Sequence, residues 1–188
     1  MTTTKTPADT APTLDGFEVL DDCHRQILAM LGKLATLTQR LERDGPDAEV
    51  RALAREVGQF FSGAAREHHV DEERHVFPKL LGSGDADTRQ AVLRLQQDHG
   101  WIEEDWLEIA PQLDAVAMGM SSYDVDQLKA GIEIFDALSR DHIALEESMI
   151  YPQARAGLRP DEKREMDREM AARRRPGAAR HGRSERPT

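Results

Sequence analysis

Four segments of this sequence carry apolar side chains at steps of three and four residues, and this periodicity most constrains how the chain can fold. The segments cover about residues 14–43, 46–81, 87–117 and 123–156, and breaks rich in Gly, Pro, Asp and Ser separate them. Apolar residues at this spacing lie on one face of an α-helix, and that face is buried against other helices. No window shows the sustained alternation typical of a β-strand. The sequence therefore predicts an all-α fold, an antiparallel up-down four-helix bundle.

The two ends of the chain differ from these periodic segments. Residues 1–13 are rich in Thr, Pro, Ala and Asp and predict a disordered leader before a bundle of residues 14–158. Residues 159–175 predict a short, highly charged fifth helix that packs outside the bundle. Residues 171–188 hold six arginines and a single acidic residue, Glu185. We therefore expect residues 176–188 to form a basic, disordered tail.

Composition excludes several classes of protein. The chain has 188 residues, enough for one compact domain, and its 25 basic and 35 acidic residues give a net charge of −10. This acidity makes nucleic-acid binding unlikely. The single cysteine, Cys23, excludes an internal disulfide and cysteine-rich zinc or iron–sulfur sites. No secretory signal and no apolar run long enough to span a membrane is visible, so we expect a cytoplasmic protein.

The second and fourth segments repeat one another at an offset of 74 residues. Both contain the pattern Phe-x4-Arg-acid-His-x3-Glu-Glu-x2-aliphatic-aromatic-Pro, which begins at Phe61 in one and at Phe135 in the other. Amphipathic helices often match at apolar positions, but rarely at a His, two Glu and a Pro together. The first and third segments match more weakly at an offset of 75, where Cys23-His24 aligns with Asp98-His99. We therefore interpret the chain as two related helical hairpins whose inward side chains meet in the core.

Each predicted helix places one histidine on its apolar stripe, and three of them add a glutamate four residues later. Residues four apart are neighbours on one helix face, so each such pair points the same way. Burying these groups costs several kcal/mol per ion unless something compensates for the charge. A pair of metal ions would do so, whereas the alternatives are a buried His–Glu hydrogen-bond network or groups that face solvent. Because four helices carry the pattern in register, we favour a metal site formed by His24, His68, Glu72, His99, Glu103, His142 and Glu146.

The types of side chain limit which metal this is. Imidazole and carboxylate ligands without a thiolate suit iron or manganese, with zinc as a further option. A carboxylate has two oxygens and can span two metal ions, whereas a neutral imidazole is a terminal ligand. A ferritin-like site needs Glu-x-x-His pairs on two helices, and only Glu72-x2-His75 matches. The zinc-protease motif His-Glu-x-x-His is absent from the sequence.

These motifs resemble those of the hemerythrin family, specifically the bacterial hemerythrin-like HHE cation-binding domains, over about residues 15–156. The resemblance rests on His24, His68-x3-Glu72-Glu73 ending in Phe77-Pro78, His99, and His142-x3-Glu146-Glu147 ending in Tyr151-Pro152. It implies a non-haem centre of two iron ions with an oxo or hydroxo bridge, in which Glu72 and Glu146 bridge the irons.

The chain departs from the oxygen-carrying hemerythrins on the third helix. Those proteins have His-x3-His there, whereas this sequence has His99-x3-Glu103. Glu103 is the first choice for a further ligand. His75 is a rival because it lies two turns along the same face as His68. His69 lies about 100° round the helix from His68, so we expect it to touch a neighbouring helix or solvent.

The resemblance implies a protein that binds or reacts with small oxidants, namely hydrogen peroxide, dioxygen or nitric oxide. A carboxylate at Glu103 in place of an imidazole should favour ferric iron and disfavour reversible oxygenation. We therefore expect reaction with peroxide or nitric oxide, in oxidative or nitrosative stress, and catalase-like turnover is one form of it. The alternatives are a reversible dioxygen or nitric oxide binding or sensing module, and an iron store or donor. The sequence does not indicate an oligomeric state.

Overall fold

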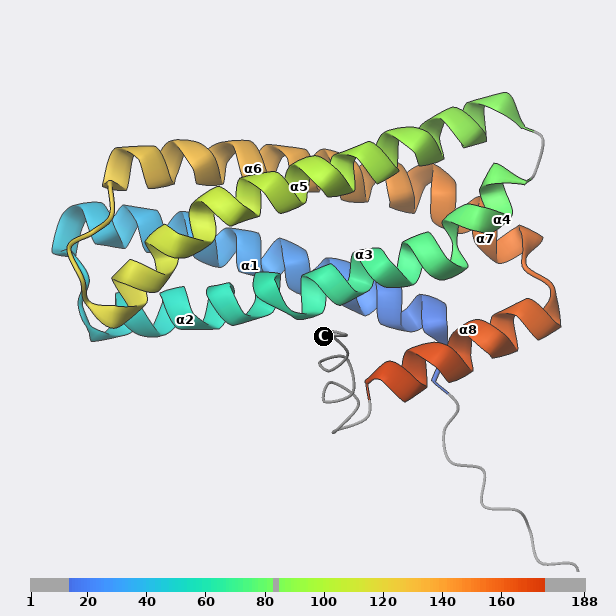
Figure 1. The fold of residues 1–188 in the computed structure, drawn as a ribbon, viewed down its shortest axis with the longest axis horizontal. Helices are drawn as coiled ribbons and strands as arrows, with labels where there is room; N and C mark the ends of the chain where they lie inside the picture. Colours follow the sequence, from blue (N-terminus) through green and yellow to red (C-terminus); the bar gives the residue numbers. More distant parts are fainter. Residues whose placement is uncertain (1–13, 83–84, 175–188) are drawn as a thin grey trace, which may run out of the picture.

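A computed structural model describes residues 14–82 and 85–174, and over these ranges it confirms the predicted all-α bundle (Figure 1). The first rod is α1, Gly16–Asp44. The second consists of α2 (Ala48–Ser62), α3 (Ala64–His75) and α4 (Phe77–Leu81). The third is α5, Ala86–Met118. The fourth consists of α6 (Val125–Leu145), the π-helical turn η1 (Glu146–Ile150) and α7 (Tyr151–Gly157), and α8 (Pro160–Arg173) follows. The expected leader and basic tail, residues 1–13 and 176–188, lie outside the described residues.

Short connections make consecutive rods antiparallel neighbours. α1 packs against α2 and α6, and α5 packs against the same two helices, so the four rods form a closed ring. Figure 1 shows them side by side along the long axis of the molecule. The turns use residues suited to helix ends: the carboxylates of Asp15, Asp47 and Asp124 accept hydrogen bonds from the first backbone N–H groups of α1, α2 and α6. Gly45 and Gly119 follow α1 and α5 with φ of 73° and 70°, a region that favours glycine.

The two repeats are interrupted at equivalent points. Pro78 and Pro152 lack the N–H that would continue the helical ladder. In the second rod the helix breaks at Val76, between α3 and α4. In the fourth rod the ladder continues through η1, where the Tyr151 N–H donates to the carbonyl of Glu146, five residues earlier. Single π-helical turns of this kind are frequent at functional sites.

The core consists of two apolar clusters with a polar layer between them. One cluster includes Ile27, Phe61, Ile102 and Phe135, and the other includes Leu20, Val76, Leu95 and Ile150. The predicted site residues fall at or next to the boundary between the two clusters, as His68 and Glu72 do between Ala65 and Val76. His24 likewise lies between Leu20 and Ile27. The fold therefore places these polar side chains at the centre of the bundle, enclosed by apolar packing on both sides.

The fifth helix, α8, covers the outside of α1 and α3 near one end of the bundle (Figure 1). Met166 and Met170 are buried in the second apolar cluster. Arg173 and Arg174 both bind the buried carboxylate of Asp71 on α3. Within the described ranges, no helix has the length and apolarity needed to cross a membrane.

Candidate metal centre

Six of the predicted site residues converge in the polar layer, at least one from each rod. They are His24 of α1, His68 and Glu72 of α3, His99 of α5, His142 of α6 and Glu146 of η1. None is more than 6% exposed. Their donor atoms form two groups that share Glu72, and within each group the atoms lie within 4.8 Å of one another. One group contains His24, His68, Glu72 and Glu146, and the other contains His69, Glu72, His99 and His142.

Each buried glutamate points its two oxygens at different histidines. Oε1 of Glu72 lies 3.3 Å from Nε2 of His68 and 3.9 Å from Nε2 of His24, whereas its Oε2 lies 3.4 Å from Nε2 of His99. Oε2 of Glu146 lies 3.1 Å from Nε2 of His24, and its Oε1 lies 3.2 Å from Nε2 of His142. Both carboxylates therefore stand between a His24–His68 pair and a His99–His142 pair.

Burial and charge oppose one another at these groups. Burial disfavours ionisation of Glu72, but the neighbouring imidazoles of His68 and His99 hold the pKa of its carboxyl well below the usual range. Burial also lowers the pKa of His142, yet the carboxylates of Glu146 and Asp98 outweigh it and raise this pKa to about 10. His68 is dominated by burial, which lowers its pKa to about 4. Without a cation, the layer thus needs protons on some histidines to balance its carboxylates.

Many of the buried polar atoms have no hydrogen bond within the described part of the chain. They include both ring nitrogens of His68 and of His142, both oxygens of Glu146, Oε2 of Glu72 and Nε2 of His99. Buried polar atoms in proteins are normally satisfied, so a cluster of unsatisfied nitrogens and oxygens needs an explanation. These atoms face one another and are all metal donors. The residues therefore fit a bound metal better than the hydrogen-bond network considered as the alternative.

Comparison with known proteins agrees with this geometry. The family model of the hemerythrin HHE cation-binding domain matches residues 15–154. The chain belongs to the hemerythrin family. It is also 31% identical, over 157 residues, to an uncharacterized protein of Haemophilus influenzae, and the match covers 84% of this chain and 88% of that protein. The family resemblance expected from the His and Glu motifs is thereby confirmed.

One predicted ligand of this hemerythrin domain does not join the cluster. Oε1 of Glu103 lies 2.7 Å from a guanidinium nitrogen of Arg66, and 34% of the Glu103 side chain is exposed. Both groups of metal-donor atoms leave Glu103 out. The expectation that Glu103 supplies a further ligand is not met in this structure, because Arg66 on α3 holds the carboxylate at the surface.

The two rival histidines have different surroundings. His69 stacks on His99 of the neighbouring α5, with ring centroids 4.0 Å apart, and one of its ring nitrogens belongs to the second donor group. Burial, reinforced by His99, lowers the pKa of His69 well below its usual value, which favours the neutral imidazole. His75 lies instead beneath α8, where its Nε2 is 3.5 Å from Glu169. His69 is therefore the stronger candidate for a further metal ligand, whereas His75 is part of the contact between α3 and α8.

Tyr151, which the sequence analysis named only as the end of a motif, is a further residue of the site. Its ring stacks on His24 at an interplanar angle of 7°, and its hydroxyl donates to Oε1 of Glu72 and lies 3.1 Å from Nε2 of His24. Burial, together with the charges of Glu72 and Glu146, raises the pKa of Tyr151 well above its usual range, so the phenol keeps its proton. The repeat contains the signal for this residue, since Tyr151 aligns with Phe77 and adds a hydroxyl to it.

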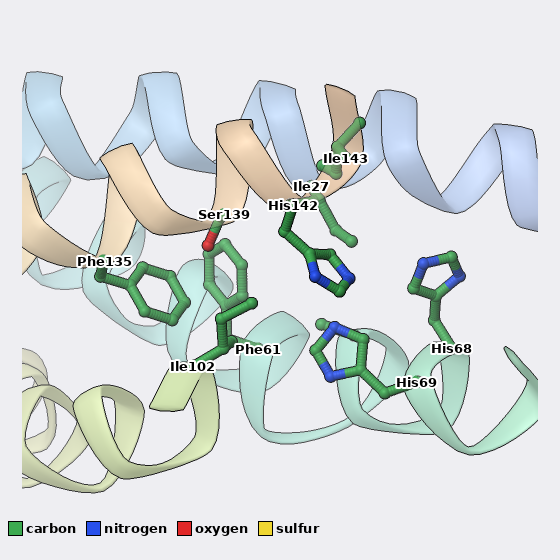
Figure 2. A pocket seen from close by; sticks show the side chains of 10 residues that line it. Ile27, Phe61, His68, His69, Ile102, Phe135, Ser139, His142 and Ile143 are labelled. Carbon is green, nitrogen blue, oxygen red and sulfur yellow. The ribbon is translucent and has the colours of Figure 1, made fainter. Parts of the chain in front are cut away.

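A small cavity of about 20 Å³ adjoins the histidines, roughly the space of one water molecule (Figure 2). Figure 2 shows His68, His69 and His142 around one side of it and the apolar side chains of Phe61, Ile102 and Phe135 around the other. A second cavity of similar size shares His69 and Ile102 with the first and extends toward Arg66 and Glu103. The space beside the centre is therefore small, largely apolar and directed toward the surface at the Arg66–Glu103 pair.

Proposed function

We propose that this hemerythrin domain holds two iron ions in the polar layer and uses them to react with a small oxidant. His24 and His68 would hold one ion, His99 and His142 would hold the other, and Glu72 and Glu146 would bridge them. The observation that carries the proposal is the division of each carboxylate between the two histidine pairs, at 3.1–3.9 Å. The second oxygen of each carboxylate faces an imidazole on the other side, which is the arrangement expected of a carboxylate that bridges two ions.

The donor set favours iron. One donor group has two imidazoles and two carboxylates, the other has three imidazoles, His69 included, and one carboxylate, and no thiolate lies among the donor atoms of the described residues. Such mixed nitrogen and oxygen sites suit iron, and manganese is the nearest competitor. Two bound irons supply reversible electron transfer to or from a small molecule.

The surroundings of the centre favour small oxidants. The cavity beside His68 and His142 has room for about one water-sized molecule, which fits hydrogen peroxide, dioxygen or nitric oxide and excludes larger substrates. Because Phe61, Ile102 and Phe135 line it, the cavity also keeps bulk water away from the layer. Tyr151 holds a proton on a buried hydroxyl beside Glu72, where it orients the carboxylate.

Tyr151 and the residues that line the cavity, and not Glu103, indicate which oxidant the centre takes. Glu103 gives no preference for ferric iron in this arrangement, because Arg66 pairs with its carboxylate. Hydrogen peroxide is favoured instead by the hydroxyl of Tyr151, which can pass a proton on without ionising, since reducing one peroxide to water consumes two protons and oxidising a second peroxide releases two. In catalase-like turnover two peroxide molecules yield two waters and one dioxygen, so one peroxide is oxidised, the other is reduced, and no further reactant is needed. Reversible binding or sensing of dioxygen or nitric oxide is the second candidate, supported by the apolar cavity.

Metal analysis followed by an oxygen-electrode assay tests the proposal. We expect about two irons per chain and dioxygen release when hydrogen peroxide is added to the iron-loaded protein. Tyr151→Phe should retain its iron and slow the release, whereas Glu104→Gln, a substitution at an exposed glutamate of α5, should behave as wild type. Two irons with no dioxygen release above that of free iron would favour the binding or sensing function. Failure to retain iron would refute the centre itself.

A further inference from the structure

The second glutamate of each Glu-Glu pair contacts a histidine of the other hairpin. Oε1 of Glu73 lies 2.8 Å from Nδ1 of His99, and Oε1 of Glu147 lies 3.1 Å from Nδ1 of His24. Glu73 and Glu147 align in the 74-residue repeat, and His24 and His99 align in the weaker repeat at 75. The two contacts are thus the same interaction, formed once by each half of the molecule.

A carboxylate at Nδ1 determines how a histidine presents its other nitrogen. It accepts the Nδ1–H, so that Nε2 carries the free lone pair and the ring is held in one orientation. Nε2 of His24 and of His99 are the atoms that face Glu72 and Glu146 in the polar layer. Glu73 and Glu147 are therefore placed to orient two of the four histidines toward a metal ion.

The remaining two histidines are not equivalent. Nδ1 of His142 faces the buried carboxylate of Asp98, with 3.9 Å between Nδ1 and Oδ2. Asp98 aligns with Cys23 in the other half, and the thiol of Cys23 contacts the carbonyl of Ala64. Nδ1 of His68 has no hydrogen bond among the described residues. Nδ1 of His142 also has no hydrogen bond within the described ranges, but a buried carboxylate lies 3.9 Å from it, and His68 has none there. The His99–His142 pair thus has two carboxylates behind it, one in hydrogen-bond contact and one nearby, and the His24–His68 pair has one.

We infer that Glu73 and Glu147 are positioning residues for metal binding, and that the His99–His142 position binds its ion more tightly than the His24–His68 position. The inference rests on the two-ion centre proposed above and adds the order in which the two ions bind. Carboxylates behind ligand histidines raise the basicity of the ring and fix its orientation, and losing one costs roughly 10- to 100-fold in metal affinity. The first ion then occupies the position of His99 and His142, and the second occupies that of His24 and His68.

Anaerobic titration of the metal-free, full-length protein with Co²⁺, in competition with a chelator, separates the two steps. For wild type we expect two ions, the first bound at least about 10-fold more tightly than the second. Glu147→Gln should leave the first step unchanged and weaken the second about 10- to 100-fold. Glu73→Gln should weaken the first step by about 10-fold or more. Both glutamates are about half exposed, at 52% and 46%, so both variants should fold, and Glu104→Gln is the matched control.

The two variants are predicted to affect different steps, and this separates positioning from a general structural role. A destabilised fold would weaken both steps alike in both variants and would lower the melting temperature of the metal-free protein. Equal wild-type affinities for both ions, or variants indistinguishable from Glu104→Gln, would overturn the inference while leaving the two-ion centre intact. Binding of fewer than two Co²⁺ ions by wild type would refute the centre itself.

Discussion

Asp71→Ala should destabilise the protein substantially, because Asp71 joins α8 to the bundle. Its carboxylate is 1% exposed on α3 and binds the guanidinium groups of Arg173 and Arg174, the latter at 2.7 Å. A hydrogen bond to a charged group contributes about 1.5–3 kcal/mol, and breaking a buried ion pair from one side costs about 3–5 kcal/mol. Both arginine side chains keep 28% of their surface exposed and can turn to solvent, which reduces the penalty. We therefore expect a loss of about 2–4 kcal/mol.

Urea unfolding of the metal-free protein, followed by circular dichroism, measures this loss without a contribution from bound metal. In a chain of this length, 2–4 kcal/mol corresponds to a fall in melting temperature of roughly 4–16 °C. Asp22→Ala is the control, since Asp22 forms an ion pair with Arg25 in which both side chains are more than half exposed. Such exposed substitutions change stability by about 0.5 kcal/mol or less.

A double-mutant cycle assigns the effect to the contact itself. Asp71→Ala and Arg174→Ala, alone and combined, should give a coupling energy of about 1 kcal/mol or more, because the residues are in direct contact. Additive effects, or an Asp71→Ala variant as stable as Asp22→Ala, would refute the view that this ion pair fastens α8.

Four further predictions concern the centre and the helix that covers it. Glu72→Ala should abolish binding of two ions. Glu103→Ala should leave the metal content of the purified protein at wild-type level. A loss of metal from the Glu103→Ala variant would show that Glu103 is a metal ligand. His69→Ala should keep two ions, because each position already has two other histidines, but it should change the rate of oxidant consumption by enlarging the cavity. Removal of metal with a chelator should lower stability by about 3–4 kcal/mol for each ion, so about 5–8 kcal/mol for two, relative to protein with metal at 100 to 1,000 times its dissociation constant, measured as a shift in the urea midpoint. Burial lowers the folded-state pKa of His75, so the unfolded chain binds this proton first as pH falls through about 6.5, and the contribution of His75 to stability declines toward acid. Relative to wild type, His75→Gln should therefore gain stability between pH 7 and pH 5, measured by unfolding at each pH.

The helices, and the convergence of six polar side chains between the two apolar clusters, were predictable because periodicity and repetition report directly on the core. His68 and Glu72 share a face by their spacing, and the repeat places His142 and Glu146 opposite them. The same reasoning did not predict where the side chain of Glu103, four residues after His99, lies. Four residues advance about 40° round a helix, so the second side chain lies inside the bundle or at its rim, depending on which side of the stripe the first one occupies. Arg66, on α3, pairs with Glu103 and holds its carboxylate at the rim, and no pattern in the sequence of α5 predicts where Arg66 lies.

The contacts between the two hairpins could not be predicted from a sequence motif either. The spacing of Glu73 and Glu147 from His68 and His142 directs them away from the stripe, which suggests solvated carboxylates. Only the assembled bundle brings each one to Nδ1 of a histidine in the other half. The single turn of π-helix at η1 was also unpredicted, because the sequences around Pro78 and Pro152 are alike although one rod breaks and the other continues.

Two repeated hairpins packed about a pseudo-two-fold axis would by themselves predict two identical metal positions. The positions differ only through residues at which the halves differ, and two such differences act on the same side. Tyr151, in place of Phe77, puts a hydroxyl against His24 and Glu72. Cys23, in place of Asp98, leaves Nδ1 of His68 without a carboxylate. In the proposed centre, the side with the weaker backing thus also has the protonated phenol, so we expect ligand exchange and proton transfer to concentrate at the His24–His68 position.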